Sequence, residues 1–231
     1  MATNTIVVEL FGFPGCGKTT LCSNIKEAKC IKVADFEDVL NDWSKATITH
    51  KLRSLPFLVI CRCILFFLST KILPSKNRRI YYDIIRRAIL AKFAKQLSKY
   101  DFVFFDHGFL QGMHSFFYGH EKDLNKQSQC RIRRITESLS RYVGLHIYCQ
   151  LPIDVTIQRL QSRNSSAHSR MDYLRHDYSR ISSALEIQQK FFDQLFMIVS
   201  EAHGANIASI STAGTVNEMT AQLSTLIGIY R

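Results

Sequence analysis

Hydrophobic residues along the chain follow two patterns, short apolar runs typical of strands and longer stretches with helical spacing. The strand-type runs cover residues 5–11, 30–34, 102–105, 145–149 and 206–210. The stretches between them place apolar residues three or four positions apart, as at 153–160, 178–199 and 216–227. Strands that alternate with helices predict one α/β domain over residues 1–231, with a mostly parallel five-stranded sheet between two layers of helices.

The longest helical stretch lies between the second and third predicted strands. Apolar residues recur there every four positions, at Tyr81, Ile85, Ile89, Phe93 and Leu97. We expect this stripe to face the core.

The first predicted strand runs into the sequence Gly12-Phe13-Pro14-Gly15-Cys16-Gly17-Lys18-Thr19, which fits the phosphate-binding pattern GxxxxGK[ST]. Glycines let backbone N–H groups surround phosphate oxygens, Lys18 neutralises phosphate charge, and the Thr19 hydroxyl is a ligand for Mg²⁺. The alternative is a glycine-rich turn before an ordinary helix, but a strand before the motif and a helix after it favour a nucleotide site. The predicted ATP-binding residues are Gly12, Pro14, Gly15, Cys16, Gly17, Lys18, Thr19 and Thr20.

Two acids follow directly on predicted strands, Asp35 after the second and Asp106 after the third. Ligands of parallel α/β sheets gather at the carboxyl ends of the strands, so both acids are expected near the phosphate loop. We predict that Asp106 joins Thr19 at Mg²⁺ and that Asp35, or else Asp38, orients a phosphoryl acceptor. The alternative for Asp35 and Asp38 is an acidic helix start, favoured by the helix dipole.

The form G-F-P-G-C-G-K-T-T resembles the phosphate loop of adenylate-kinase-like and shikimate-kinase-like enzymes, and the run 102–108 is similar to the third strand of that nucleoside and nucleotide kinase group. The resemblance implies the strand order 2-3-1-4-5, a helical acceptor-binding region at 36–100 and a lid at 159–173. It also implies that Arg159, Arg163 and Arg170 close over the transferring phosphoryl group. His107 departs from the thymidylate-kinase-like members, which carry arginine after the acid.

The expected activity is therefore transfer of the ATP γ-phosphoryl group to a small-molecule hydroxyl or phosphate, with Mg²⁺ as cofactor. The acceptor is a nucleoside, a nucleotide or another metabolite. A nucleotide-dependent regulatory ATPase is an alternative from another class. A GTPase is disfavoured, because Asn125-Lys126-Gln127-Ser128 lacks the acid of the guanine-binding element N-K-x-D.

The charge distribution changes this picture in one segment. The chain has 30 Lys and Arg against 19 Asp and Glu, and residues 51–99 alone hold twelve basic residues against Asp83. This segment also contains the apolar run 55–68, which is too short to span a bilayer. Four interpretations remain open: a buried helix with a basic rim, a pocket for an anionic acceptor, peripheral contact with an anionic membrane, and a nucleic-acid patch. The poor aromatic interleaving disfavours nucleic acid.

Seven cysteines without a CxxC pair predict a reduced, cytoplasmic protein, with membrane association if the apolar run binds lipid. The N-terminal run lacks the charged start and cleavage site of a signal peptide. Cys16, inside the phosphate loop, is either a small filler residue or a thiol activated by the helix end.

Overall fold

The protein is described here by a computed structural model, which covers residues 5–27, 32–69, 74–118, 126–162, 177–203 and 206–229. The strands are β1 (Ile6–Gly12), β2 (Val33–Ala34), β3 (Phe102–Phe105), β4 (Leu145–Gln150) and β5 (Ile207–Ser211). The first five helices are α1 (Lys18–Glu27), α2 (Phe36–Lys45), α3 (Ile48–Arg53), α4 (Phe57–Ser69) and α5 (Pro74–Lys95). The others are α6 (Phe109–Tyr118), α7 (Lys126–Leu139), α8 (Ile153–Ser162), α9 (Tyr178–His203) and α10 (Val216–Ile229).

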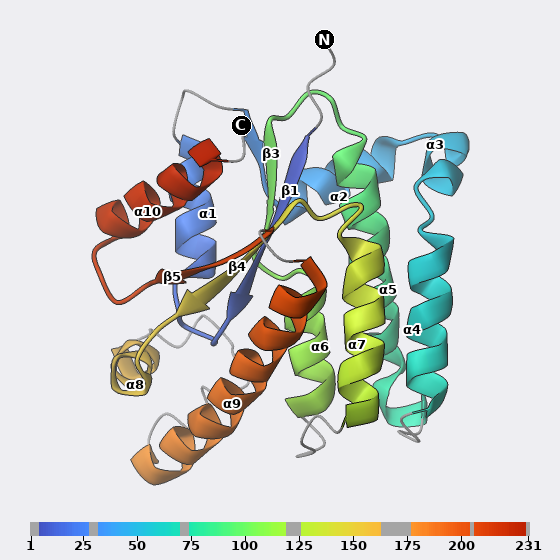
Figure 1. The fold of residues 1–231 in the computed structure, drawn as a ribbon. Helices are drawn as coiled ribbons and strands as arrows, with labels where there is room; N and C mark the ends of the chain where they lie inside the picture. Colours follow the sequence, from blue (N-terminus) through green and yellow to red (C-terminus); the bar gives the residue numbers. More distant parts are fainter. Residues whose placement is uncertain are drawn as a thin grey trace.

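The five strands form one sheet in the order β2-β3-β1-β4-β5, and every pairing is parallel. This confirms the predicted sheet and its strand order. β1 lies at the centre, where Val8 is in register with Phe104 of β3 and with Leu145 of β4. Since all strands point the same way, the loops after β1 and β3 emerge side by side at one edge (Figure 1).

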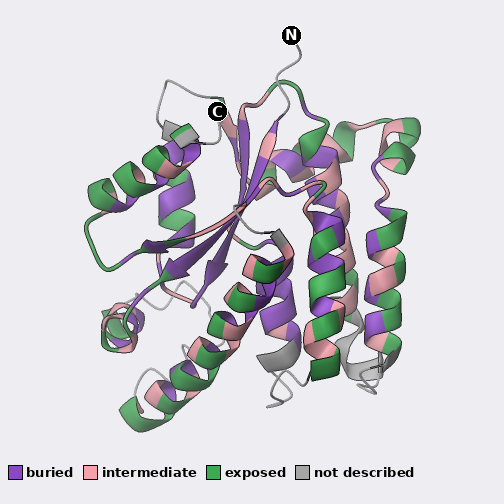
Figure 2. Ribbon diagram, in the orientation of Figure 1, coloured by how far each residue is buried: buried purple, intermediate pink, exposed green. Residues whose placement is uncertain are grey.

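The helices cover both faces of the sheet, as the alternation predicts (Figure 1). Helices α1 and α10 pack on one face, and α5, α6, α7 and α9 lie on the other. Side chains alternate along β1: Val7 packs in the cluster beside α5, and Val8 and Leu10 join the larger cluster. Most residues of the central strands β1, β3 and β4 are buried, which explains why these strands are largely apolar (Figure 2).

The expected stripe in α5 is only partly in the core. Tyr81, Ile85 and Ile89 are half-buried, whereas Ile84 and Ala88 are fully buried. Each residue of an α-helix turns by about 100°, so a repeat of four residues drifts by about 40° at every step. The stripe therefore winds around the helix and enters the core only towards its C-terminal end, where Phe93 and Leu97 are buried. Leu97 already lies beyond the end of α5.

Helix α4 packs on α5 and α7, on the side of these helices that faces away from the sheet (Figure 1). Val59, Cys63 and Phe66 are buried against that layer. The opposite side of α4 is exposed, so the apolar run 55–68 is not the buried helix that one interpretation of the sequence required. In the described part of the chain, no helix is long and apolar enough to cross a membrane.

Candidate functional site

The loop between β1 and α1 has a backbone that only glycine tolerates. Gly12, Gly15 and Gly17 have φ angles of +142°, +90° and +87°, in the region that side chains disfavour. A Cβ on Gly12 would also lie 2.5 Å from the carbonyl oxygen of Cys149 in β4. The three glycines of the motif thus allow the loop to curl tightly against the sheet.

Lys18 begins α1 and points back into this loop. Its side chain is buried, and Nζ donates to the carbonyl oxygens of Gly12 at 3.0 Å and Phe13 at 2.7 Å. Its ammonium group also lies 3.4 Å from the sulfur of Cys16. An ammonium group that is held inside the loop by backbone carbonyls is well placed to bind phosphate oxygens.

Cys16 is a fully buried thiol beside that lysine. Burial alone would raise its pKa, but a hydrogen bond from the Cys149 thiol and the charge of Lys18 outweigh burial and lower the pKa of Cys16 to about 6. The same contact, with Cys149 as donor to the Cys16 sulfur, raises the pKa of Cys149 well above its ordinary value. Cys16 therefore acts as an anionic partner for Lys18.

Thr19 and Asp106 meet across the loops that follow β1 and β3. The Thr19 hydroxyl donates to Oδ2 of Asp106 at 2.7 Å. A hydroxyl and a carboxylate at hydrogen-bond distance can ligate one hard cation together, so this pair fits the expected Mg²⁺ site. Among the described residues there is no cluster of three or more His, Cys, Asp or Glu side chains suited to a metal.

The loop after Asp106 is held by Arg87 of α5. The Arg87 guanidinium donates to the backbone carbonyls of His107 and of Gly108, the latter at 2.9 Å, and pairs with Asp83 at 2.8 Å. Desolvation of the ring, with the charges of Lys18 and Arg87, lowers the pKa of His107 against the opposing effect of Asp106. His107 is therefore neutral near pH 7.

Glu9 supports the same loop from inside the sheet. Its carboxylate, buried in β1, accepts from the backbone N–H of Leu110 at the start of α6 and lies 3.3 Å from Nδ1 of His146. A Cβ on Gly108 would lie within 2.4 Å of Glu9, so the loop passes directly over the carboxylate. The side-chain oxygen of Gln111 accepts from the N–H of Gly12 at 3.2 Å, which joins α6 to the phosphate loop.

Sequence reasoning missed these supporting residues. Glu9 alone carried a signal, since it is an acid inside an otherwise apolar strand. Arg87 is one of many cations in its segment, and Gln111 and Cys149 stand in unremarkable patterns.

Asp35 follows β2, as predicted, and caps α2. Its carboxylate accepts from the N–H of Asp38 at 3.0 Å, and the Asp38 side chain accepts from the N–H of Asp35. Lys26 of α1 contacts Asp35 at 2.9 Å and Asp38 at 2.6 Å. Partial burial would raise the pKa of Asp35, but Lys26 and the Asp38 N–H outweigh burial and lower it. Both acids thus form a capping box, the arrangement that the helix-dipole interpretation requires.

Of the three lid arginines, Arg159 alone falls among the described residues. It extends from α8, and Nη2 donates to the carbonyl of Thr212 after β5 at 2.9 Å. Nη1 lies 3.8 Å from the position of a Cβ on Gly17, so the guanidinium reaches the phosphate loop. Arg163, Arg170 and most of the predicted lid at 159–173 lie outside the described residues.

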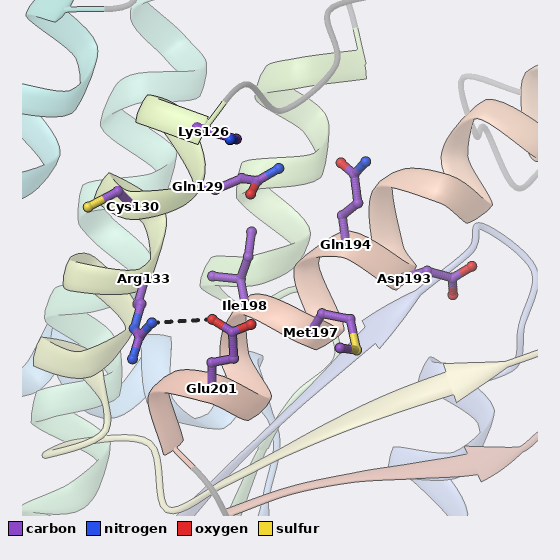
Figure 3. Close-up of a pocket in the computed structure, with 9 residues that line it drawn as sticks. All are labelled: Lys126, Gln129, Cys130, Arg133, Asp193, Gln194, Met197, Ile198 and Glu201. Atoms are coloured by element: carbon purple, nitrogen blue, oxygen red, sulfur yellow. Dashed lines mark hydrogen bonds and ion pairs between the residues drawn. The ribbon is translucent and has the colours of Figure 1, made fainter.

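A separate groove of about 430 Å³ lies between α7 and α9 (Figure 3). Arg133 and Glu201 form an ion pair of 3.2 Å in its wall. None of its lining residues comes from the phosphate loop, from β3 or from α8. The groove is therefore a different feature from the predicted nucleotide site.

Comparison with solved structures identifies the fold. Deoxyadenosine kinase from M. mycoides with bound dCTP superposes with a TM-score of 0.51 at 12% identity, over 96% of this chain and 99% of the other. Thymidylate kinase from Candida albicans superposes with a TM-score of 0.53 at 13% identity, over 98% of this chain and 92% of the other. The chain has the fold of the P-loop nucleoside and nucleotide kinases, as its phosphate loop predicted. No protein-family model matches the sequence. No curated protein matches it either.

Proposed function

We propose that the protein is an ATP-dependent phosphotransferase that moves the γ-phosphoryl group to a small-molecule hydroxyl or phosphate. The observation that carries the proposal is the contact between Thr19 and Asp106 at 2.7 Å, directly beside the buried Lys18. A cation and a metal-ligand pair converge where a polyphosphate enters the loop. This combination serves phosphoryl transfer, in which catalysis is mainly positioning and charge stabilisation.

Each residue has a defined task in this proposal. Lys18 exchanges its carbonyl partners for phosphate oxygens, and the backbone N–H groups from Gly15 to Thr19 surround them. Thr19 and Asp106 hold Mg²⁺, which neutralises phosphate charge when the metal nucleotide is bound. Arg159 approaches the loop from α8 and places a planar cation near the transferring group. Arg163 and Arg170 complete the proposed lid.

The acceptor is oriented by Asp106 or Asp35 in this proposal. Asp106 is the better placed of the two, because it contacts Thr19, whereas Asp35 is tied to Lys26 and to the start of α2. An aspartate with a lowered pKa is a weak base, so Asp35 would act by accepting a hydrogen bond from the acceptor hydroxyl. The helical region 36–100 then supplies the walls of the acceptor pocket, together with the loop after β3 that Arg87 holds.

The test is ATP turnover with a panel of nucleosides, nucleotides and other hydroxylated or phosphorylated metabolites. We expect one class of acceptor to be phosphorylated, and Lys18→Ala to abolish the transfer. Lys190→Ala, an exposed lysine of α9, is the matched control and should retain full activity. Transfer that survives Lys18→Ala would refute the assignment. Hydrolysis without any acceptor would instead support the regulatory ATPase.

A membrane-surface kinase for a lipid-linked or other anionic acceptor is the second candidate. The exposed apolar side of α4, in the most basic part of the chain, favours it. Such an enzyme would phosphorylate acceptors presented in vesicles faster than the same acceptors in detergent.

A further inference from the structure

The outward side of α4 is an apolar surface. Phe57, Leu65 and Leu68 are 69%, 65% and 72% exposed, and Leu58 and Ile64 are about half exposed. Cys61, also exposed, lies among them. With about 100° per residue, these positions fall within one arc of roughly 120° around the helix. We call the six residues Phe57, Leu58, Cys61, Ile64, Leu65 and Leu68 the α4 face.

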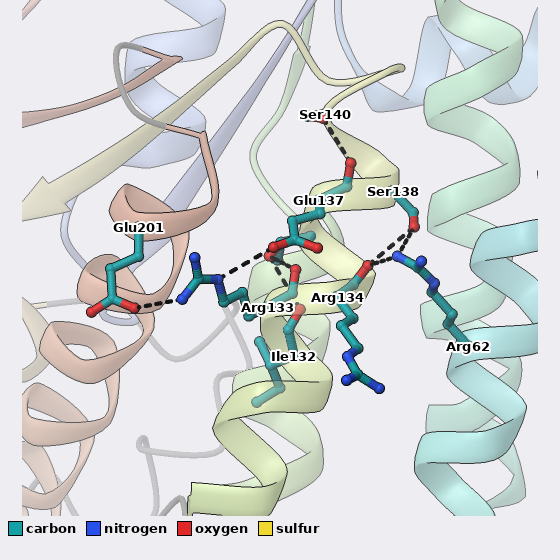
Figure 4. A network of polar contacts seen from close by, with 9 residues as sticks. Arg62, Ile132, Arg133, Arg134, Glu137, Ser138, Ser140 and Glu201 are labelled. Carbon is teal, nitrogen blue, oxygen red and sulfur yellow. Dashed lines mark hydrogen bonds and ion pairs between the residues drawn. The ribbon is translucent and has the colours of Figure 1, made fainter.

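No polar side chain of α4 interrupts this face. The single charged residue of the helix, Arg62, turns the other way and donates to the backbone carbonyl of Arg134 and the hydroxyl of Ser138 in α7 (Figure 4). Docking on α7 therefore uses the one cation of α4, and the residues of the α4 face carry no charge. The preceding helix α3 adds two exposed side chains, Ile48 and Leu52.

The surroundings of the α4 face are basic. Exposed cations occur on each neighbouring helix, at Arg53 in α3, Arg79 in α5 and Arg134 in α7. The Arg134 side chain extends beside α4 in Figure 4. No aspartate or glutamate occurs between Asp42 and Asp83 in the sequence, and Asp83 itself is paired with Arg87. The only acid of α7, Glu137, pairs with Arg133. The face thus combines exposed hydrocarbon with unbalanced positive charge.

We propose that the α4 face binds the surface of an anionic lipid bilayer. Its apolar side chains enter the boundary between headgroups and acyl chains, and the flanking arginines contact lipid phosphates. The 13 residues of α4 span roughly 20 Å, less than the hydrocarbon thickness, so the helix would lie in the plane of the membrane. This inference is independent of the proposed phosphotransferase activity.

The charge around the α4 face favours an anionic membrane over a second copy of the chain as its binding partner. Two copies packed through the α4 face would bring two basic rims together without an acid on either side, and each copy carries a net charge of +11. Like charges across an interface oppose association. An anionic lipid surface instead complements the rim.

The test is co-sedimentation of the protein with phosphatidylcholine vesicles, with and without phosphatidylglycerol. We expect binding to the anionic vesicles at low salt and at least tenfold weaker partitioning to the neutral ones. High salt should weaken the binding, since ions screen the arginines. Equal binding to both vesicles, or no binding to anionic vesicles at low salt, would overturn the proposal.

The matched variants are two double substitutions of leucine-sized exposed side chains. Leu65→Gln with Leu68→Gln removes apolar contacts of the face and should lower partitioning at least tenfold. Ile187→Gln with Met197→Gln changes side chains of α9 that are 57% and 59% exposed, and should leave partitioning unchanged. Equal losses in the two variants would overturn the assignment to α4.

Sedimentation velocity in the absence of lipid tests whether the α4 face binds a second copy of the chain instead. We expect a monomer for the parent protein and for both variants. A dimer that the Leu65 and Leu68 substitutions dissociate would assign the α4 face to a second copy and refute the membrane proposal. Circular dichroism of each variant verifies that the fold is retained.

Discussion

The phosphate loop and the α3–α5 region both concentrate positive charge, but they handle it in opposite ways. At the loop, Lys18 is only 6% exposed and is surrounded by carbonyl oxygens and the Cys16 sulfur. The α3–α5 region contains both exposed cations, such as Arg53 and Arg79, and exposed leucines. A buried cation that is held in place by hydrogen bonds suits the binding of one small anion, such as a phosphate group. An exposed surface that is both basic and apolar suits the binding of a larger surface, such as an anionic membrane. This difference supports our proposals of a phosphate-binding site at the loop and a separate docking surface at α4.

Of the variants below, removal of the Asp106 carboxylate should have the largest effect on the rate of phosphoryl transfer. Asp106→Asn keeps the hydrogen bond with Thr19 but loses the negative charge that a metal ligand needs. We expect the rate of phosphoryl transfer to fall by about 10²- to 10³-fold. Steady-state kinetics over a range of Mg²⁺ concentrations is the measurement. Asp154→Asn, on the exposed side of α8, serves as the control, and a rate equal to that of the parent would exclude Asp106 from the site.

A side chain at Gly12 should break the loop itself. Gly12→Ala meets the Cys149 carbonyl at 2.5 Å in a backbone region that alanine disfavours. We expect a loss of about 4 kcal/mol in the free energy of unfolding, together with loss of nucleotide binding. Gly228→Ala in α10 is the control, because nothing lies within 4 Å of the new methyl group. Urea denaturation of the two variants compares them, and similar stabilities would contradict the steric constraint on Gly12.

The pair of Cys16 and Lys18 should make stability depend on pH. The pKa of Cys16 is about 6 in the folded protein, below the ordinary value of 9.0. The unfolded state therefore binds more protons between these values, so stability increases from pH 6 to pH 9 and is lost as the pH falls through 6. The difference between the parent and Cys16→Ala should grow by about 1 kcal/mol per pH unit in this window. Chemical denaturation at several pH values measures this difference in the free energy of unfolding. A difference that does not change with pH would show that Cys16 is not a thiolate in the folded protein.

Neighbouring positions of α4 should differ sharply in what they contribute to stability. Phe66 is 1% exposed and Leu65 is 65% exposed. Phe66→Ala should cost about 3 to 5 kcal/mol in the free energy of unfolding, whereas Leu65→Gln should change it by less than about 0.5 kcal/mol. Thermal denaturation is sufficient to tell them apart. A large loss of stability for Leu65→Gln would show that this leucine contributes to the fold and is not part of a free docking surface.

Local patterns in the sequence identified much of the fold and the centre of the site. The five strands follow from the alternation, and the roles expected of Gly12, Lys18 and Thr19 follow from the motif. The strand order was implied by the resemblance to the nucleoside and nucleotide kinase group. The partnership of Thr19 with Asp106 also followed, because parallel strands bring their carboxyl ends together. The supports of the site did not follow, since Glu9, Arg87 and Gln111 act on residues from 20 to about 100 positions away.

The α5 stripe shows where a local pattern misleads. A four-residue repeat looks like one face of a helix, yet only packing against the sheet decides which part of it is buried. The position of Asp35 after β2 was predicted from the sequence, but only the tertiary structure shows that its oxygens contact Lys26 and the N–H of Asp38.

The sequence by itself determined the phosphate loop, because glycines, lysine and threonine at fixed spacing impose one local backbone and one kind of ligand. It also determined the basic, apolar character of residues 51–99. Only the tertiary structure decided which side of α4 faces outward, because that depends on how α5 and α7 cover the helix. Tertiary contacts between segments that are distant in the chain also brought Glu9 and Arg87 to the loop after β3, and Arg159 to the phosphate loop.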